Sequence, residues 1–289
     1  MEAEAAGRGY LEHLTDQDLR FLAASADLRP ELAGRLRSQP AVVLQLVERP
    51  ELFDQVFEPD DPARLAWVSP FLAFQVAIGA TGRELATTRF VAERTSPRER
   101  VPVFDTPQLR DFLADPLRRL FLAELLASFV RVASGRFWTR TARGWQRRRF
   151  SELDPVQLAQ LASETPRAYR PGVYRRLGDV SLFLTGVFPD YAQRHAFGPL
   201  DAARLLRATG LSPADDQAGL AAAAPIELLE QLGQRWYRRA FALAPVATAQ
   251  LAVVAQVAAR FRDARRVLNQ VSDRYLTRVG NPWFGPPGS

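Results

Sequence analysis

The chain of 289 residues contains no cysteine and no lysine, and it has only two histidines. Without cysteine there is no disulfide framework, no thiolate metal site and no cysteine nucleophile. Without lysine there is no Schiff-base chemistry, no Walker lysine and no kinase lysine. Two histidines are too few for a histidine-rich metal site, and neither stands in an HExxH or Glu-x-x-His motif. These absences exclude many of the familiar catalytic classes.

Other signals are missing as well. The sequence has no GxSxG, no GxGxxG and no glycine-rich loop that opens a helix. Its apolar runs are too short to span a bilayer, and the start MEAEAAGRGYLEH lacks the apolar region of a secretory signal. A pair of carboxylates could still serve a hydrolase, but no sequence motif points to such a pair. We therefore predict no catalytic residue, no metal and no cofactor, and a cytoplasmic protein without a membrane partner.

Arginine supplies all 38 basic residues, and the formal net charge is +6. Exclusive use of arginine fits a GC-rich codon bias, which weakens the overall charge as an argument for a nucleic-acid partner. The distribution is more informative. Residues 1–62 hold 6 arginines against 13 acidic residues, whereas residues 63–289 hold 32 against 19. The two parts attract each other, so the segment either packs on the body or masks a basic surface.

Apolar residues recur at helical spacing along almost the whole chain. This predicts an all-α fold, a multi-helix bundle of roughly ten helices with one central β-hairpin and a long C-terminal helix. Pro30, Pro40 and Pro50 each open a short helical segment, because proline is tolerated in the first turn and breaks a helix elsewhere. Longer helices are expected over 70–94 and 116–134, with a connector between them.

The same pattern predicts how the chain is organised. We expect an acidic short-helix segment (1–62), a helical half (63–134), a basic hairpin (135–152) and a second helical half (153–289), together forming one compact domain.

The hairpin is predicted from the stretch GRFWTRTARGWQRRRF, residues 135–150, which contains six arginines, four aromatic residues and no acid. Its aromatic and threonine content predicts two strands, with Ala142-Arg143 as the turn and a left-handed glycine after it. We expect Trp138 opposite Arg148 and Phe137 opposite Arg149, as cross-strand pairs of arginine and aromatic ring.

Those internal pairs explain part of the arginine content, and binding of an anion is the alternative. Guanidinium forks and aromatic faces are the groups that grip phosphates and bases, and a two-stranded ribbon can enter a groove of duplex DNA. The candidate anion- or nucleic-acid-binding residues are Arg136, Trp138, Arg140, Arg143, Trp145, Arg147, Arg148 and Arg149.

Two acidic residues stand in apolar surroundings. Asp179 lies in YRRLGDVSLFLTGVFPDY, residues 174–191, and Glu124 lies in LFLAELLASF. An unpaired buried charge is costly, so each carboxylate needs a cationic partner, for which Arg175, Arg176 and Arg119 are available. We predict a buried polar cluster of Glu124, Arg175 and Asp179. It is either a structural clamp, the interpretation we favour, or a ligand pocket.

The C-terminal part is predicted as one long helix over 245–279. A heptad seam runs along it through Val254, Val257, Phe261, Ala264, Leu268, Val271 and Tyr275. The seam either packs inside the bundle, which we favour, or forms a homodimer. The following tail, NPWFGPPGS, carries two large aromatic residues, and we expect it to fold back on the body rather than to dock a partner.

Several segments together resemble a family of uncharacterised, predicted-helical bacterial proteins found mainly in actinobacteria. They are VPVFDTPQLRDFLADPLRRLFLAELLASF, RRRFSELDP, YRRLGDVSLFLTGVFPDY and LGQRWYRRAF, and the most specific part is the Leu-Gly-Asp…Phe-Pro run at 177–189. The resemblance covers most of the chain. It implies a bacterial cytoplasmic setting and carries over no catalytic residue.

Three functions follow from these observations. The leading one is a non-enzymatic helical binding protein whose basic hairpin engages an acidic partner, either nucleic acid or an acidic protein surface. The second is a helical scaffold that oligomerises through the C-terminal seam. The third is an enzyme or small-ligand binder with a pocket near Asp179 and Glu124.

Overall fold

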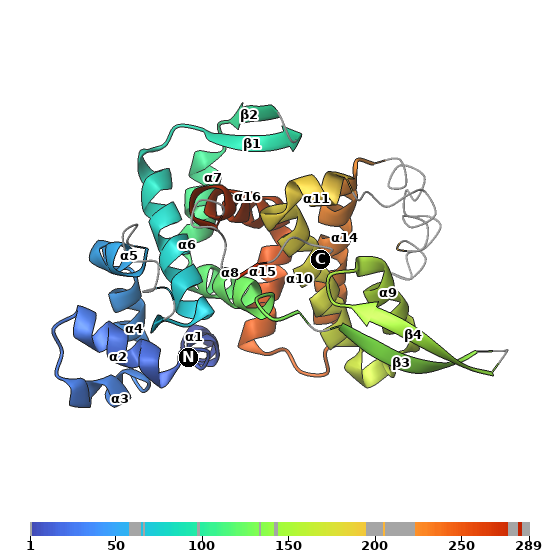
Figure 1. Ribbon diagram of the computed structural model, residues 1–289, viewed down its shortest axis with the longest axis horizontal. Coiled ribbons are helices and arrows are strands. Elements are labelled where there is room, and N and C mark those ends of the chain that lie inside the picture. Colours follow the sequence, from blue (N-terminus) through green and yellow to red (C-terminus); the bar gives the residue numbers. More distant parts are fainter. Residues whose placement is uncertain are drawn as a thin grey trace.

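A computed structural model of the chain describes residues 2–57, 65, 67–96, 99–132, 134–141, 144–194, 205, 223–276 and 283–284. Most of these residues lie in helices, and the strands form separate two-stranded hairpins (Figure 1). The predicted all-α class with a central hairpin is therefore confirmed.

The N-terminal part consists of short helices followed by longer ones. Its elements are α1 (Glu2–Leu11), α2 (Asp16–Ser25), η1 (Pro30–Leu32), α3 (Ala33–Leu36), α4 (Pro40–Val47), α5 (Pro50–Val56), α6 (Pro70–Thr87), β1 (Val91–Ser96), β2 (Glu99–Val103), α7 (Thr106–Ala114) and α8 (Pro116–Ser128). Pro30, Pro40 and Pro50 each begin a helical element, as predicted. Ser69 and Asp115 cap the following helices by accepting hydrogen bonds from the amides of Leu72 and Leu117.

The C-terminal part begins with the central hairpin. Its elements are β3 (Ser134–Thr141), β4 (Gly144–Ser151), α9 (Pro155–Glu164), η3 (Arg167–Tyr169), α10 (Arg170–Val187), α11 (Pro189–Arg194), α14 (Pro225–Leu243), α15 (Ala249–Ala259), α16 (Phe261–Val271) and η4 (Ser272–Leu276). Helices α10 and α14 pack along much of their length, and α16 crosses both of them.

The first difference from the sequence prediction is a second hairpin. We expected a helix to about residue 94 and then a connector, but α6 ends at Thr87, and β1 and β2 pair antiparallel with a bulge between Arg94 and Ser96. The helix ends at β-branched Thr87 and Thr88, and such residues favour extended backbone. Pro102 is tolerated because each strand of a two-stranded ribbon has a free edge.

The second difference concerns the long C-terminal helix, which is divided at Arg260. The backbone of Arg260 leaves helical geometry, with φ −121° and ψ 36°. Both helices contact α14, but α15 also packs on α1 and α8, whereas α16 packs on α6, α7 and α10. The break thus lets the two halves meet partly different neighbours. No local sequence signal predicts this break, because neither proline nor glycine occurs between Ala249 and Val271.

All seven residues of the predicted heptad seam are buried in this single chain, from Val254 on α15 to Tyr275 on η4. The interpretation as intramolecular packing is the one that this burial supports. Because the chain itself covers the seam, the structure gives no support to a homodimer or a scaffold formed through it.

Glycines allow the central helices to approach closely. A Cβ built on Gly178 of α10 would lie 2.4 Å from the ring of Tyr237 on α14, and one built on Gly186 would lie 2.7 Å from Cβ of Leu268 on α16. Both contacts are far shorter than any real Cβ contact, so only glycine fits at these crossings. Glycine at these two positions therefore lets α10 approach both α14 and α16 closely.

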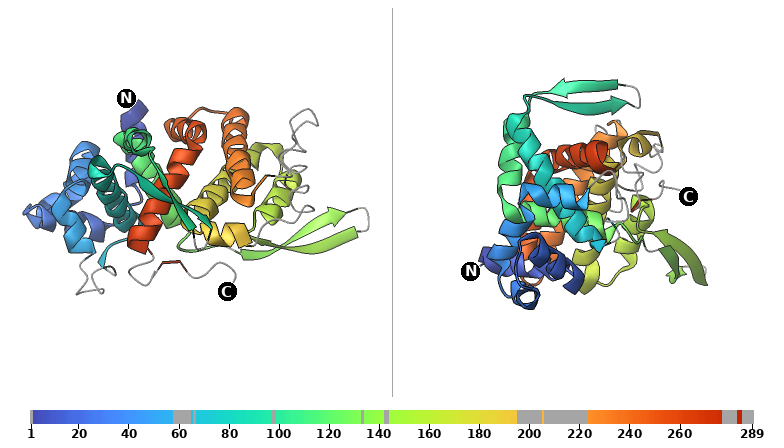
Figure 2. Two further views of the ribbon diagram at one scale, coloured as in Figure 1. Left: turned by 90° about the horizontal axis from the view of Figure 1, so that it is seen from above. Right: turned by 60° about the vertical axis from the view of Figure 1, so that its left-hand side comes forward.

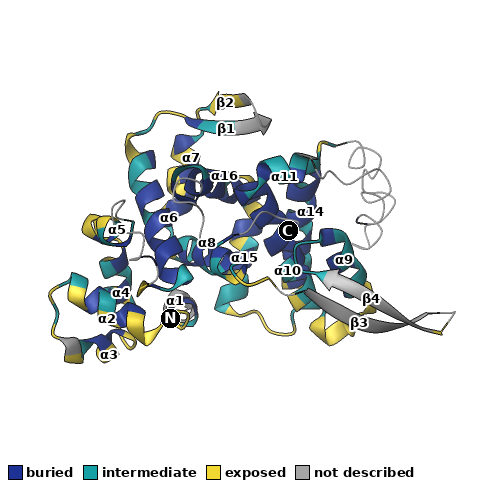
Figure 3. Ribbon diagram, in the orientation of Figure 1, coloured by how far each residue is buried: buried dark blue, intermediate teal, exposed yellow. Residues whose placement is uncertain are grey.

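One continuous apolar core extends from Tyr10 on α1 to Phe284 in the tail. Figure 3 shows its buried residues concentrated on the central helices, with exposed residues toward the periphery. Phe284 stacks on Phe74 with ring centroids 5.5 Å apart and meets Phe183 edge-on. The tail folds back on the body at this point, as expected from its sequence. Within the part of the chain that the structure describes, no helix combines the length and apolarity needed to cross a bilayer.

The hairpin β3–β4 stands away from the helical body. Its contact with the body is made mainly through β4 and α9, and Figures 1 and 2 show the ribbon extending past the helices at one end of the molecule. The acidic N-terminal helices α1 to α5 lie at the other end, where they pack on α6, α8 and α15. The described residues of the acidic segment therefore pack on the helical body rather than on the hairpin, and Glu48 pairs there with Arg119 of α8.

Candidate functional site

The pairing of the central hairpin differs by one residue from the predicted register. The structure places Trp138 opposite Arg147 and Phe137 opposite Arg148, where we expected Arg148 and Arg149. The two-residue connection is as predicted, because Thr141 pairs with Gly144, and Gly144 has the positive φ of 102° expected of a glycine at this turn. The predicted loop is therefore correct, and the predicted strand pairing is wrong by one residue.

That one residue decides which hairpin residues share a face. Residues opposite each other in an antiparallel ladder lie on the same face, and successive residues along a strand alternate between faces. The ladder continues without a bulge from Ser134↔Ser151 to Thr141↔Gly144. The pairs Arg136↔Arg149, Trp138↔Arg147 and Arg140↔Trp145 therefore place four arginines and both tryptophans on one face.

The opposite face has a different character. It carries the pairs Gly135↔Phe150, Phe137↔Arg148 and Thr139↔Gln146. Of the hairpin arginines that the structure describes, Arg148 alone lies on this face. Arg143 lies outside the described residues. We name the six-residue set of Arg136, Trp138, Arg140, Trp145, Arg147 and Arg149 the Arg/Trp face.

The predicted polar cluster is brought together between helices α8, α10 and α14. Arg175 Nη2 donates to Glu124 Oε2 at 2.7 Å, and Arg175 Nε lies 4.0 Å from Asp179 Oδ2. The buried Tyr237 hydroxyl donates to Asp179 Oδ1 at 2.8 Å. Arg175 is thus the cation shared by both carboxylates. Arg119, another predicted candidate, pairs with Glu48 instead.

Helix α1 and the turn after it add two groups to this cluster. His13 Nε2 lies 3.4 Å from Glu124 Oε1. The hydroxyl of Tyr10 is buried and has no hydrogen-bond partner among the residues described. Sequence reasoning missed both residues, because the other members of the cluster are more than a hundred positions away in the chain.

Burial and the neighbouring groups act in opposite directions on the two carboxyls of the cluster. Burial raises the pKa of the Asp179 carboxyl, and the charge of Arg175 and the hydrogen bond from Tyr237 offset that rise only in part. Burial and the neighbouring Asp179 also raise the pKa of the Tyr237 hydroxyl. For Glu124 burial acts upward too, but His13 and Arg175 together bring its pKa below the ordinary value. The two carboxyls therefore titrate in opposite directions from their ordinary values.

These contacts join four separate parts of the chain through charge-assisted hydrogen bonds. Each carboxylate already has a donor, and the shared Arg175 balances part of their charge. The geometry is that of a clamp between the turn after α1 and helices α8, α10 and α14, which is the interpretation favoured from the sequence. The arrangement of the cluster is explained without a bound ligand or a metal ion.

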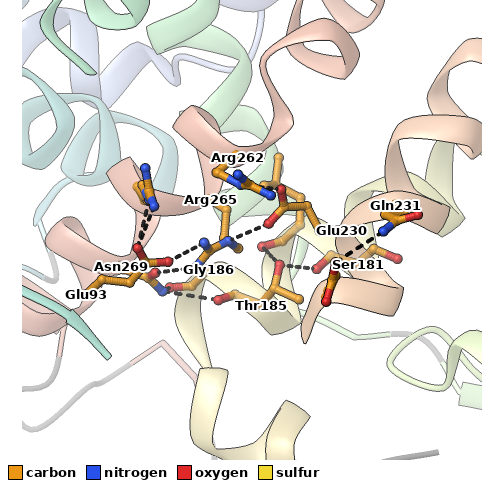
Figure 4. A network of polar contacts seen from close by, with 12 residues as sticks. Glu93, Ser181, Thr185, Gly186, Glu230, Gln231, Arg262, Arg265 and Asn269 are labelled. Carbon is orange, nitrogen blue, oxygen red and sulfur yellow. Dashed lines mark hydrogen bonds and ion pairs between the residues drawn. The ribbon is translucent and has the colours of Figure 1, made fainter. Parts of the chain in front are cut away.

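A second polar network lies between α14, α16 and β1, and the sequence analysis did not identify it. Arg265 is only 5% exposed; its Nε donates to Glu230 Oε2 at 3.1 Å, and its Nη2 pairs with Glu93 (Figure 4). Arg262 Nε donates to Glu230 Oε1 at 2.8 Å, and Arg266 pairs with Glu93.

The network reaches α10 as well. Asn269, which accepts from Arg265, donates to the carbonyl oxygens of Thr185 and Gly186. Arg266 also pairs with Asp105, so three arginines face three carboxylates and the charges balance. This balance indicates a structural role. The sequence signal that could have indicated this network is the run RDARRVLNQV, in which arginines alternate with residues of the buried seam.

Among the residues described, no group of three or more histidine, aspartate or glutamate side chains is arranged to hold a metal ion. The comparisons with known proteins add no assignment: no family model, no curated protein and no solved structure matches this chain. The family resemblance and the cytoplasmic location stay predictions.

Proposed function

We propose that the protein is a non-enzymatic nucleic-acid-binding protein and that its β3–β4 hairpin supplies the contact surface. The observation that supports this most is the pairing register, which gathers four arginines and two tryptophans on one face of the ribbon. No acidic residue occurs between residues 135 and 150 to neutralise them.

The composition of the Arg/Trp face favours a nucleic acid over an acidic protein. Guanidinium groups bind phosphate oxygens through paired N–H donors, and tryptophan offers a surface on which a base stacks. An acidic protein surface would use the arginines but would not need two tryptophans between them. Stacking requires an unstacked base, so single-stranded nucleic acid is the form we expect to bind best.

The position of the hairpin supports the same proposal. The ribbon stands away from the helical body, and the acidic helices of the first 62 residues pack at the other end of the molecule (Figures 1 and 2). A strand of nucleic acid can therefore approach the ribbon without displacing that segment.

The salt dependence of binding tests this proposal quantitatively. Four phosphate contacts on a single strand predict that log K falls with log salt at a slope of about −2.8, which weakens binding about 50-fold between about 50 and 200 mM salt. Removing two of the contacts, in Arg147→Gln with Arg149→Gln, predicts a slope of about −1.4 and a decrease of about 7-fold. Fluorescence anisotropy of a labelled single-stranded oligonucleotide measures both slopes.

The hairpin contains its own matched control. Arg148 stands between the two substituted arginines and has the same chemistry, but the register places it on the opposite face. Arg148→Gln should therefore leave the slope nearly unchanged. Equal losses for Arg148→Gln and Arg147→Gln would contradict the assignment of faces. Competition by polyglutamate as strong as that by an oligonucleotide would replace nucleic acid with an acidic protein as the partner.

A further inference from the structure

A cleft of about 400 Å³ lies between α6, α7 and α8, beside the end of α4, and is separate from both the hairpin and the buried polar cluster. Three arginines line it, one from each helix: Arg83 from α6, Arg110 from α7 and Arg119 from α8. Among its lining residues, Glu48 is the one carboxylate. The groups that line the cleft therefore carry two positive charges in excess.

Glu48 organises two of the three arginines. Its carboxylate pairs with Arg119 Nη2, and its backbone carbonyl accepts a hydrogen bond from Arg83 Nη1 at 3.1 Å. Arg119 also donates to the carbonyl oxygen of Leu113. Arg119 is thus neutralised and held in place, while the Arg83 guanidinium is positioned by a neutral group.

The guanidinium groups of Arg83 and Arg110 differ from that of Arg119. Neither Arg83 nor Arg110 forms an ion pair with any residue that the structure describes. This contrasts with Arg118 on α8, Arg260 at the break between α15 and α16, and Arg266 on α16, each of which has a carboxylate partner. Like charges gathered in a concave surface raise the local potential and attract anions.

Two glycines of α6 form part of the cleft lining, and packing does not require them. A Cβ on Gly79 or on Gly82 would stand 3.7 Å from its nearest neighbour, which is an ordinary van der Waals distance. Glycine is disfavoured inside a helix, and at Gly178 a close helix crossing explains it. At Gly79 and Gly82 no close contact requires glycine, and a methyl group there would lie against Arg83 or Leu113, which both line the cleft.

We infer that this cleft binds a small anion with two or more negative charges, held by Arg83 and Arg110. Its volume lies within the range of small-molecule sites. The planar fork of arginine matches both phosphate and carboxylate oxygens, so the ligand class is a phosphorylated or polycarboxylate metabolite. This inference is independent of nucleic-acid binding by the hairpin.

Isothermal titration calorimetry of the full chain with pyrophosphate and, separately, with citrate tests the inference at matched ionic strength. The two probes distinguish a phosphate ligand from a carboxylate ligand. Arg110→Gln and Arg83→Gln should each weaken binding of the preferred probe about 10-fold or more, because each removes charged hydrogen bonds. Arg89→Gln is the control, since Arg89 is exposed, follows α6 and does not line the cleft.

A second variant separates lost binding from lost folding. Gly82→Ala narrows the cleft while favouring the helix, so it should weaken binding with an unchanged or raised melting temperature. The inference fails if neither probe binds the wild-type protein. It also fails if Arg110→Gln and Arg83→Gln bind like the wild type while Arg147→Gln with Arg149→Gln does not, since the anion would then be held by the hairpin.

Discussion

Substituting Gly178 by alanine tests the closest helix crossing in the structure. The added Cβ would lie 2.4 Å from both Cδ1 and Cε1 of Tyr237, whereas carbon atoms in contact stand about 3.5–4.0 Å apart. The ring or one of the helices must therefore move by more than an ångström. Tyr237 is fully buried between Phe121 and Phe261, and its hydroxyl is bonded to Asp179, so it has little freedom to retreat.

The magnitude follows from three effects. Overpacking a core costs about 1–3 kcal/mol, and losing the hydrogen bond to Asp179 costs about 1.5–3 kcal/mol more. Replacing a helical glycine by alanine returns about 1 kcal/mol. We expect Gly178→Ala to lower the free energy of unfolding by about 3 kcal/mol, within a range of about 1.5–5 kcal/mol.

Urea unfolding followed by circular dichroism measures this loss, and the same helix provides the control. Gly172 also lies on α10, but a Cβ there would meet no atom within 4 Å. Gly172→Ala should therefore be neutral or stabilising by up to about 1 kcal/mol. If the two alanine variants had equal stability, the crossing of α10 and α14 described above would be wrong.

Three further predictions concern the buried polar groups and the tail. Asp179→Asn should gain stability relative to the wild type as the pH rises from about 4. An unfolded aspartate ionises near pH 3.9, whereas burial raises the native pKa, so the free energy of unfolding of the wild type falls between these two pKa values. A stability difference between the two proteins that is independent of pH in urea titrations would refute this. Arg265→Met should cost about 3–5 kcal/mol, since it removes a donor from the buried carboxylate of Glu230 and from the partly buried one of Glu93, while exposed Arg131→Met should change stability by less than about 0.5 kcal/mol; similar urea midpoints of unfolding for the two variants would contradict the network. Phe284→Ala should cost about 3 kcal/mol by emptying the space between Phe74 and Phe183, and an unchanged melting temperature would show that the tail does not pack there.

Local signals in the sequence determined where most helices begin and which faces they bury. Pro40 and Pro50 begin helices because the first turn needs no amide donor from them. Ser69 and Asp115 cap helices through hydrogen bonds that span two or three residues. The seam from Val254 to Tyr275 is buried because its spacing follows the helical period. Each of these outcomes depends on interactions within a few positions.

The buried polar cluster was only partly determined by the sequence. Two carboxylates in apolar segments required a cation, which predicted Glu124, Asp179 and a choice among three arginines. The selection of Arg175 depends on how α8 lies across α10. Tyr10 and Tyr237 enter the cluster from helices far away in the chain, which no spacing could reveal.

Only the tertiary structure decided the rest. The break at Arg260 separates α15 and α16, which pack on partly different neighbours. Glu93 pairs with Arg265, which lies 172 positions away in the sequence. The composition of the hairpin predicted a basic ribbon, but the pairing of Trp138 with Arg147 decided which arginines share the face of the tryptophans. Contacts between distant segments depend on how whole helices and strands are placed, and a pattern of neighbouring residues carries no information about that placement.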